Sequence, residues 1–304
     1  MSPKRIVVVG ATGNQGGSVI NALLAHGGYA VRGLTRDTAS AGSQELAAKG
    51  VEMLQASLMD RAGLVEAVKG AYAVFGVSIP FTQDSETDQG KNIADACKAN
   101  SVPLLVWTSL PSATELSNGK VTGMNMLDAK AEVDKYVKTI GQPTVILHTG
   151  SFTENLLNFG QLQRISAGKW QIHFPIAPPD HVQPFTYIHK DVGPTVSAII
   201  DHWEDTSWRQ RLTKTPLVMC SYKLCGQEMA LELAKLTGTD VTYVAEIDTV
   251  PEPLKSMYIF CRDYWDYPGP IPATILSDLG VKIHTFEDFV GDKVAVFMST
   301  KDSE

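Results

Sequence analysis

The sequence has few cysteines, and their spacing excludes the usual metal and redox motifs. Its 304 residues contain four cysteines, at positions 97, 220, 225 and 261. No two of them have the CxxC spacing of a zinc site or a redox-active dithiol. So few cysteines in a chain of this length also disfavour a disulfide-stapled secreted domain. We interpret all four as reduced thiols, in the core or incidental, of a cytosolic protein.

The chain also lacks an excess of positive charge and a long apolar run. Its formal net charge is -7, whereas nucleic acids and anionic membranes bind basic surfaces. No apolar run approaches the roughly 18 residues of a membrane span. Lys4 and Arg5 precede an apolar run, as in a signal peptide, but no cleavage region follows. We expect a cytoplasmic protein, with a nuclear location as the alternative, and neither direct nucleic-acid binding nor a membrane partner.

A glycine-rich turn follows the first apolar run. Residues 6–9 read Ile-Val-Val-Val, and glycines follow at positions 10, 13 and 16 before apolar periodicity resumes. Strand, tight turn and helix in this order are typical of a dinucleotide site, where glycines let the backbone approach the pyrophosphate. The amino terminus of the helix then directs its unpaired N–H groups at the phosphates. The pattern predicts a nucleotide site, with a purely structural turn as the alternative.

The end of the second predicted strand indicates which dinucleotide is preferred. An acidic residue at this place binds the ribose 2′-hydroxyl group of NAD, whereas an arginine matches the 2′-phosphate of NADP. Thr35 stands where the acid is expected, and Arg36 follows it directly. We therefore predict NADP(H). Two alternatives stay open: Arg36 is an ordinary solvated arginine, or Asp37 binds the ribose of NAD.

The first 150 residues alternate between apolar runs and amphipathic segments. Strands are predicted at 6–9, 30–34, 51–55, 73–77, 104–107 and 144–147, with helices between them, among them 16–25, 44–49, 84–100 and 127–139. This alternation predicts an α/β fold with a Rossmann-type doubly wound parallel sheet. Loops at the carboxyl ends of the strands line the ligand edge. We therefore expect Ser57 beside the adenine and the backbone of Val77 and Ser78 beside a ribose.

Beyond Gly150 the rhythm changes, which predicts a second, smaller α/β lobe. Its expected elements are a helix opening at 151–155, strands at 170–174, 217–219 and 241–244, a helix at 226–236 and an aromatic tract at 258–267. The tract is interpreted as core, with a ligand wall or partner surface as the alternative. A helix at about 191–203, with Asp191 as a candidate N-cap, is expected to return to the sheet. The predicted domains are 1–150, which binds NADP, and 151–304, which binds a substrate or partner.

Four segments read together resemble the NmrA-like family, an atypical branch of the short-chain dehydrogenase/reductase superfamily. They are GATGNQGG at 10–17, LTR at 34–36, DAKAEV at 128–133 and FTENL at 152–156. The resemblance covers most of the chain and is strongest in the first 160 residues. It implies a Rossmann-type NADP-binding domain and a smaller lobe with a cleft between them. It also implies one of two roles, because several members are regulators that read the nicotinamide pool through protein partners, while related branches are NADPH-dependent reductases.

The resemblance also implies roles for individual residues. Phosphate binding is assigned to the turn residues Gly10, Thr12, Gly13, Asn14, Gln15 and Gly16. Arg36 is placed at the 2′-phosphate and Lys130 near the nicotinamide ribose. Phe152 and Asn155 are placed near the nicotinamide end.

The usual catalytic pair of short-chain reductases is absent. Those enzymes need a tyrosine acid four residues before a lysine, so that both project from one helical face. Lys130 is present, but position 126 is methionine, whose thioether cannot donate a proton. Ser109 ends the fifth strand, where a serine polarises the substrate carbonyl. Lys130 is then either the acid itself, as one reductase branch suggests, or only a ligand of the ribose hydroxyl groups.

Four histidines are the remaining candidates for proton transfer: His148, His173, His181 and His189. His173 and His181 flank a proline-rich loop, and we interpret them as surface or structural residues, with a position over the cleft as the alternative. Two functions fit the whole pattern. The first is an NADP(H) sensor in which cofactor occupancy changes the affinity for a regulatory partner protein. The second is an NADPH-dependent reductase of a small quinone or conjugated carbonyl, assisted by Lys130 or Ser109. We favour the sensor because the cofactor pattern is intact while the tyrosine is missing; a non-redox enzyme has no specific support.

Overall fold

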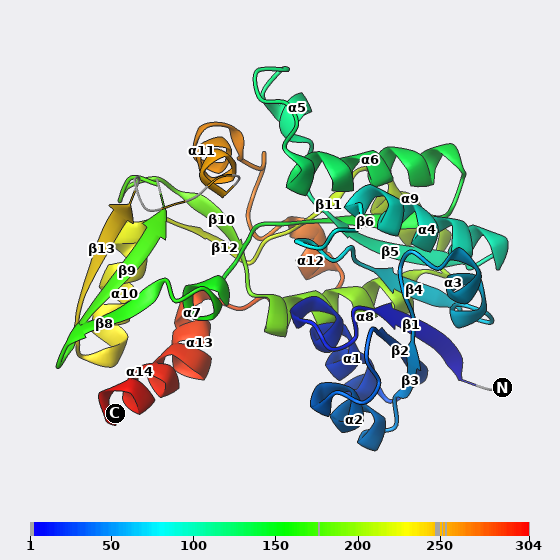
Figure 1. The fold of residues 1–304 in the computed structure, drawn as a ribbon, viewed down its shortest axis with the longest axis horizontal. Helices are drawn as coiled ribbons and strands as arrows, with labels where there is room; N and C mark the ends of the chain where they lie inside the picture. Colours follow the sequence, from blue (N-terminus) through cyan, green and yellow to red (C-terminus); the bar gives the residue numbers. More distant parts are fainter. Residues whose placement is uncertain (1–2, 176, 247–249, 251, 253, 304) are drawn as a thin grey trace. The chain divides into compact units, whose positions relative to one another are not determined.

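The computed structural model describes residues 3–303 except 176, 247–249, 251 and 253. The chain forms two compact units. The first unit comprises the chain up to His148 together with Ile188–Val218 and Ile275–Val281, and the second unit comprises Thr149–Tyr187, Met219–Thr274 and the chain from Lys282 onward. Figure 1 labels the elements of both units. The division into domains 1–150 and 151–304 stays a prediction.

A seven-stranded sheet forms the centre of the first unit. Its strand order is β11-β6-β5-β4-β1-β2-β3. The strands are β1 (Lys4–Val9), β2 (Tyr29–Thr35), β3 (Glu52–Gln55), β4 (Ala73–Gly76), β5 (Leu104–Ser109), β6 (Thr144–Thr149) and β11 (Leu217–Met219). The pairs from β3 across to β6 are all parallel. The chain therefore winds outward from β1 in both directions, which confirms the predicted Rossmann-type doubly wound α/β fold.

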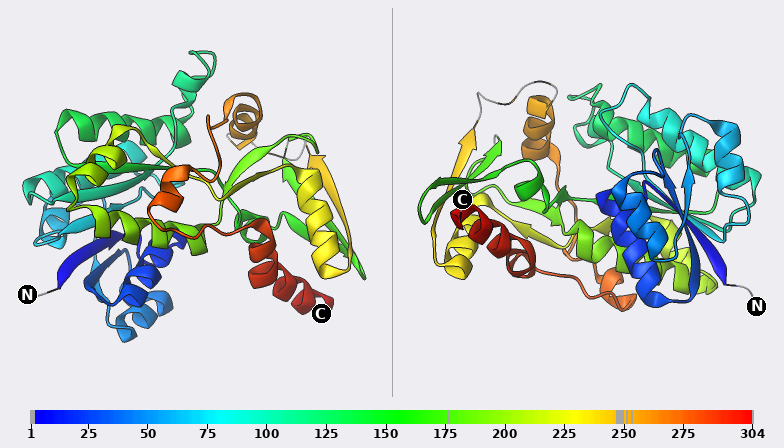
Figure 2. Two further views of the ribbon diagram at one scale, coloured as in Figure 1. Left: turned by 180° about the vertical axis from the view of Figure 1, so that it is seen from behind. Right: turned by 60° about the horizontal axis from the view of Figure 1, so that its bottom comes forward.

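Helices lie on both faces of this sheet (Figure 2). The helices of the first unit are α1 (Asn14–His26), α2 (Ala41–Ala48), α3 (Arg61–Ala67), α4 (Glu86–Ala99), α5 (Ala113–Leu116), α6 (Asn125–Thr139), α8 (Gly193–His202), α9 (Thr206–Lys214) and α12 (Thr274–Asp278), and a π-helical turn, η1 (Ile188–Val192), precedes α8. One face packs against α3, α4 and α6, and Val7, Ile93 and Val133 share its buried apolar cluster. Helices α1 and α8 pack together on the opposite face (Figure 2).

Two expectations for this region are wrong. Residues 217–219, expected in the smaller lobe, form β11 at the edge of the seven-stranded sheet. A three-residue apolar run carries no periodicity that could tell one sheet from another. Asp191 is not an N-cap, because it lies inside η1 and α8 begins after Val192. Gly193 allows the close approach of α8 to α1, since a β-carbon there would lie 2.1 Å from the backbone oxygen of Ser18.

The second unit contains two three-stranded sheets. One has the order β12 (Tyr222–Leu224), β10 (Gln183–Thr186), β7 (Ser151–Phe152), and the other β13 (Asp240–Glu246), β9 (Lys169–Pro175), β8 (Leu162–Ser166). Its helical elements are α7 (Asn155–Asn158), α10 (Gly226–Thr237), α11 (Leu254–Tyr264), α13 (Phe286–Phe289), η2 (Val290–Val294) and α14 (Ala295–Ser303). The strands expected at 170–174 and 241–244 and the helix at 226–236 are confirmed. The helix expected to open at 151 is wrong in its start, because 151–152 form β7.

The aromatic tract and the cysteines belong largely to buried structure, as the sequence indicated. Phe260 is 1% exposed and stacks on Tyr264. Tyr267 donates a hydrogen bond from its hydroxyl group to the backbone oxygen of Thr149. All four cysteines are buried and free, and burial raises the pKa of Cys261 to about 12. None of the helices formed by the described residues has the length and apolarity of a membrane span.

Candidate functional site

The turn between β1 and α1 depends on close backbone packing. Gly10 has a φ of +64°, and its carbonyl oxygen accepts a hydrogen bond from the N–H of Gly13 at 2.9 Å. A β-carbon on Gly16 would lie 2.2 Å from that same oxygen, so only glycine lets the helix begin here. Thr12, Gly13 and Asn14 are exposed. The N-cap residue, Gly13, has no side chain to cap the first N–H groups of α1, which leaves them available to an anion.

Gln15 connects this turn to the neighbouring half of the sheet. Its side-chain carbonyl oxygen accepts a hydrogen bond from the Thr108 hydroxyl group at 2.8 Å. Thr108 lies at the carboxyl end of β5, where parallel strands present residues to a ligand. The phosphate-binding role that the resemblance implies for Gln15 stays a prediction, and the contact shows how its side chain is held.

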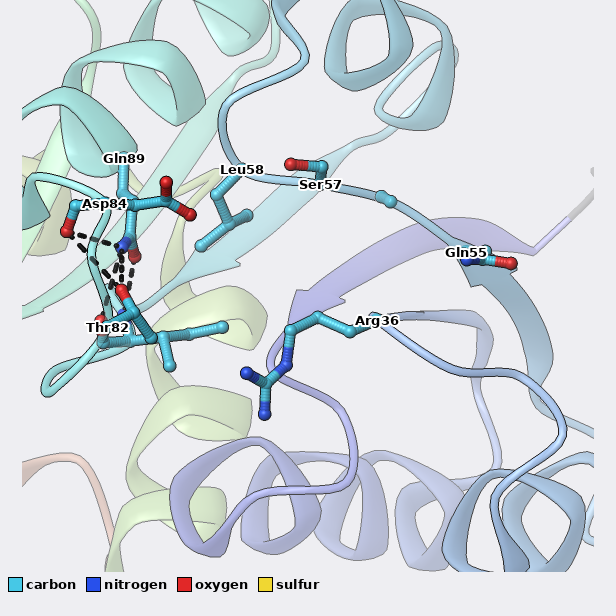
Figure 3. Close-up of a pocket in the computed structure, with 9 residues that line it drawn as sticks. Arg36, Gln55, Ser57, Leu58, Thr82, Asp84 and Gln89 are labelled. Carbon is cyan, nitrogen blue, oxygen red and sulfur yellow. Dashed lines mark hydrogen bonds between the residues drawn. The ribbon is translucent and has the colours of Figure 1, made fainter.

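A pocket of about 140 Å³ lies where β2, β3 and β4 end. Its lining residues are Arg36, Gln55, Ala56, Ser57, Leu58, Ile79, Thr82, Asp84 and Gln89. Figure 3 shows the Arg36 guanidinium group pointing into the space that Leu58 and Thr82 border. Whole small-molecule sites measure roughly 300–1,000 Å³, so this pocket fits one end of a larger ligand.

Arg36 and Asp37 differ in their surroundings. Arg36 is exposed, and among the described residues no hydrogen bond or ion pair holds its guanidinium group. The Asp37 carboxylate accepts the N–H of Ala39 at 2.8 Å, and the Asp37 N–H faces the buried Thr35 hydroxyl group at 3.3 Å. Asp37 therefore shapes the turn that leads to α2. Arg36 is the residue of this segment that is available to a ligand.

Gln89, on α4, holds one wall of the pocket and was not singled out in the sequence. Its side-chain oxygen accepts the N–H of Ile79 at 2.7 Å, and its amide group donates to the Ile79 oxygen at 3.2 Å. Gln89 is 2% exposed. A glutamine on the apolar face of the helix predicted at 84–100 was the available signal, because a buried amide needs hydrogen-bond partners. On the other side, the Ser57 hydroxyl oxygen accepts the N–H of Met59 at 3.2 Å.

Lys130 lies in a half-buried cluster with Ser78 and Glu86. Its ammonium group donates to the Glu86 carboxylate and to the Ser78 hydroxyl oxygen. Ser78 donates in turn to Glu86 at 2.7 Å. The Lys130 and Glu86 side chains are only 14% and 12% exposed. The cluster joins α6, the start of α4 and the segment after β4. Ser78 follows Val77 in this segment, and the Val77 side chain would lie 3.1 Å from a β-carbon on Gly10.

The structure does not join Ser109 to this cluster. Ser109 is 1% exposed, and its hydroxyl group donates at 3.4 Å to the backbone oxygen of Leu110. No hydrogen bond between Ser109 and Lys130 occurs within the part of the chain that the structure describes. Met126 occupies the helical position four residues before Lys130, on the helix that begins at Asn125 rather than at the predicted 127.

Asp128 fastens the segment after β5 to α6. Its carboxylate accepts three hydrogen bonds, from the Ser112 hydroxyl group at 2.8 Å, the Thr114 N–H at 3.1 Å and the Thr114 hydroxyl group at 2.9 Å. Burial raises the pKa of Asp128, but these hydrogen bonds outweigh burial and hold the pKa below its usual value. The contacts fix the start of α6 and therefore the course of the helix that carries Lys130.

The remaining predicted residues lie elsewhere. His148 pairs with Asp134 at 3.1 Å, with side chains 12% and 11% exposed, which favours the structural interpretation. His189 lies in η1, and His173 lies on β9 of the second unit. His181, Phe152 and Asn155 also belong to the second unit; the positions of Phe152 and Asn155 near a nicotinamide stay predictions. Among the residues described, no group of three potential metal ligands occurs.

The family follows from comparison of the whole chain. Residues 2–293 match the model of the NmrA-like family. This protein belongs to the NmrA-like family. It is 29% identical to the NmrA-like family domain-containing oxidoreductase ptmS of Penicillium ochrochloron, over 86% of this chain and 84% of the relative. It is also 29% identical to the corresponding oxidoreductase himF of Aspergillus japonicus, over 84% of this chain and 83% of the relative.

Solved structures agree with the fold. NmrA, a negative transcriptional regulator, superposes with a TM-score of 0.80 at 20% identity, over 100% of this chain and 99% of that one. NmrA in complex with NADP gives a TM-score of 0.74 at 22% identity, over 95% and 90%. Triphenylmethane reductase of Citrobacter sp., complexed with NADP(H), gives 0.71 at 16% identity, over 95% and 99%. These similarities establish the shared fold of the NmrA-like chain.

Proposed function

We propose that this NmrA-like protein binds NADP(H), with the adenosine end at Arg36 and the pyrophosphate at the turn before α1. The observation that carries the proposal is an arginine whose guanidinium group points into a pocket at the end of β2, with no protein partner among the described residues. Such a fork matches a phosphate group. Solved neighbours of the same fold were crystallised with NADP, NADP(H) or NAD, which supports a nicotinamide dinucleotide as the ligand, while the choice of NADP rests on Arg36.

The other residues follow from this orientation of the dinucleotide. Gly10, Gly13 and Gly16 let the backbone approach the pyrophosphate, while Thr12, Asn14 and Gln15 border it. Ser57 flanks the adenine, and Thr35 supports the turn that presents Arg36. Val77 and Ser78 border a ribose, and Lys130 lies behind Ser78. When bound, the nicotinamide supplies or accepts a hydride; the chain's own residues bind and orient it.

The Arg36→Ala variant tests the choice of cofactor. A hydrogen-bonded charge contributes about 1.5–3 kcal/mol, so we expect the Kd for NADP to rise at least about tenfold while the Kd for NAD changes little. Isothermal titration of both cofactors measures the difference. Arg211→Ala is the matched control, because Arg211 is also exposed but pairs with Asp278 and does not line the pocket. Equal losses for NADP and NAD, or no loss, would remove Arg36 from the site.

For the role of the bound cofactor we propose a sensor or regulator. Position 126 carries a methionine instead of a proton donor, and Lys130 is already bound by Glu86 and Ser78. Both observations favour binding over proton transfer. A cofactor changes the affinity for a partner protein only if it prefers one conformation of the protein, so the sensor role requires a difference between the free and NADP-bound protein.

The second candidate is an NADPH-dependent reductase of a small quinone or conjugated carbonyl. It is favoured by the oxidoreductase names of the relatives from Penicillium ochrochloron and Aspergillus japonicus, and Lys130 or Ser109 would assist. NADPH oxidation against a panel of quinones, enals and ketones separates the two roles. Steady turnover that Lys130→Met abolishes supports the reductase. Tight NADPH binding without turnover across the panel supports the sensor.

A further inference from the structure

A second pocket lies in the first unit, at the amino-terminal ends of the strands, whereas the glycine turn lies at their carboxyl ends. Its volume is about 370 Å³. It is lined by the end of α6, the turn that leads into β6, and α9. The strands from β1 to β6 are parallel, so the amino-terminal start of β6 and the carboxyl end of β1 lie at opposite ends of the strands. This pocket is therefore separate from the proposed NADP site.

The floor of the second pocket is apolar. Val137, Ile146, Trp203 and Leu212 line it, and each is at most 6% exposed. The volume lies within the roughly 300–1,000 Å³ that is typical of small-molecule sites, which combine an apolar lining with a few placed polar groups. The floor therefore suits the flat apolar body of a small ligand.

The charged lining is of one sign. Lys138 and Arg209 line the pocket, and none of the other described residues that line it is acidic. Among the described residues, the Lys138 ammonium group has no hydrogen bond or ion pair. An apolar floor beside two cations is complementary to an apolar molecule with one anionic group.

The Arg209 side chain is already fixed by contacts with Trp203. Its Nε and Nη2 atoms donate to the backbone oxygen of Trp203 at 3.1 and 2.9 Å, and its guanidinium carbon lies 5.0 Å from the centre of the Trp203 ring. A side chain that is already ordered loses little entropy on binding. Its Nε–Nη2 edge is occupied by the Trp203 oxygen, and the Nη1–Nη2 edge is left to pair with a carboxylate.

We propose that this pocket is a second ligand site, which binds a small aromatic carboxylate. The aromatic ring lies on the floor around Leu212, and the carboxylate is bound by Arg209 and Lys138. The site does not depend on the proposed function, because no residue of the NADP site lines it.

Titration with 2-naphthoate and with its uncharged analogue 2-naphthalenemethanol tests the proposal, with binding followed by protein-observed NMR. We expect saturable binding of naphthoate that is at least about tenfold tighter than binding of the alcohol, corresponding to about 1.4 kcal/mol for the charge. Arg209→Gln should reduce the affinity for naphthoate to that for the alcohol. Leu212→Trp should fill the floor and abolish both. Saturating NADP should leave the Kd for naphthoate unchanged.

Arg211→Gln is the matched control. Arg211 lies on the same helix but pairs with Asp278 at 2.5 Å and does not line the pocket, so its loss should leave naphthoate binding unchanged. Lys138→Gln, at an exposed position, provides a second test if Arg209→Gln does not fold, and circular dichroism monitors folding. The proposal is overturned if naphthoate does not saturate at millimolar concentration, if the alcohol binds equally well, or if the Arg209 and Arg211 variants behave alike.

Discussion

At the scale of single residues, two adjacent glycines of the first helix differ in whether a β-carbon would fit at their position. A β-carbon on Gly16 would lie 2.2 Å from the Gly10 carbonyl oxygen, a distance that the backbone must relieve by moving. We therefore expect Gly16→Ala to open the turn, to lower the free energy of unfolding by about 2 kcal/mol or more, as overpacking does, and to weaken NADP binding at least about tenfold. Urea denaturation and titration calorimetry measure the two effects.

Gly17→Ala is the control for this prediction. A β-carbon on Gly17 meets its nearest atom, the Ala11 oxygen, only at 3.8 Å. Replacing glycine with alanine inside a helix then gains about 0.5–1 kcal/mol of stability. Equal behaviour of the two variants would show that the short contact at Gly16 does not determine the turn.

Glu86 is the residue whose loss most directly tests the Lys130 cluster. Removing one partner of a buried ion pair leaves the other charge uncompensated. Because both side chains keep slight exposure, 14% and 12%, we expect Glu86→Gln to cost about 2 kcal/mol, somewhat below the range for fully buried pairs. Asp88→Asn is the control, since Asp88 lies in the same first turn of α4 but is exposed. Chemical denaturation showing equal costs would mean that only the helix dipole is involved.

The sequence could predict Arg36 but not Glu86, for a physical reason. The position of Arg36 follows from the order of strand and loop along the sequence, because the residue after the second strand of this fold lies at the carboxyl ends of the strands, where the ligand binds. Glu86 and Lys130 are 44 positions apart, and their contact depends on how α4 and α6 pack. Periodicity assigns each helix a buried face, but it does not state which polar groups meet at the ends of two helices.

At the scale of elements, the predicted strands and helices of the first 150 residues are confirmed, with shifts of a few residues at their ends. Alternation of buried strands with amphipathic helices is a strong signal, because the helices that connect parallel strands also cover the two faces of the sheet. The weak signals were short elements. The three residues of β11 and the two of β7 are strands only because they are hydrogen-bonded to neighbouring strands, and no local pattern encodes that pairing.

The attachment of α6 to the segment after β5 depends on pH through Asp128. Its pKa is lowered in the folded protein, so its contribution to stability is complete above the unfolded pKa, about 3.9, and is lost as the pH falls through the folded pKa. At pH 7 we expect Asp128→Asn to lower the free energy of unfolding by about 2 kcal/mol, the order expected for hydrogen bonds to a charged group. The difference from wild type should shrink below pH 4.

Chemical denaturation at pH 7 and at about pH 3 measures this change. Glu132→Gln is the control on the same helix, because the Glu132 side chain is 53% exposed and its ion pair with Lys91 lies at the surface. Surface ion pairs contribute about 0–1 kcal/mol, so its cost should be small at both values. A cost of Asp128→Asn that does not change with pH would mean that the carboxylate's charge is not what holds the segment.

At the scale of the whole molecule, the first unit gathers segments that are distant in sequence, and ligand binding should reveal it as one cooperative unit. A ligand at 100 times its Kd stabilises the folded state by about 2.7 kcal/mol, which slows exchange through unfolding of that unit about 100-fold. We expect NADP to slow hydrogen exchange in α9 and β11 as much as in α1 and α4, because all four belong to the first unit. Hydrogen exchange in elements of the second unit, such as α10, should slow less.

Mass spectrometry of hydrogen exchange with and without NADP measures each segment, and α9 decides the question. If the NADP-binding domain comprised only residues 1–150 and the helix at 191–203, NADP would protect α9 no more than it protects α10.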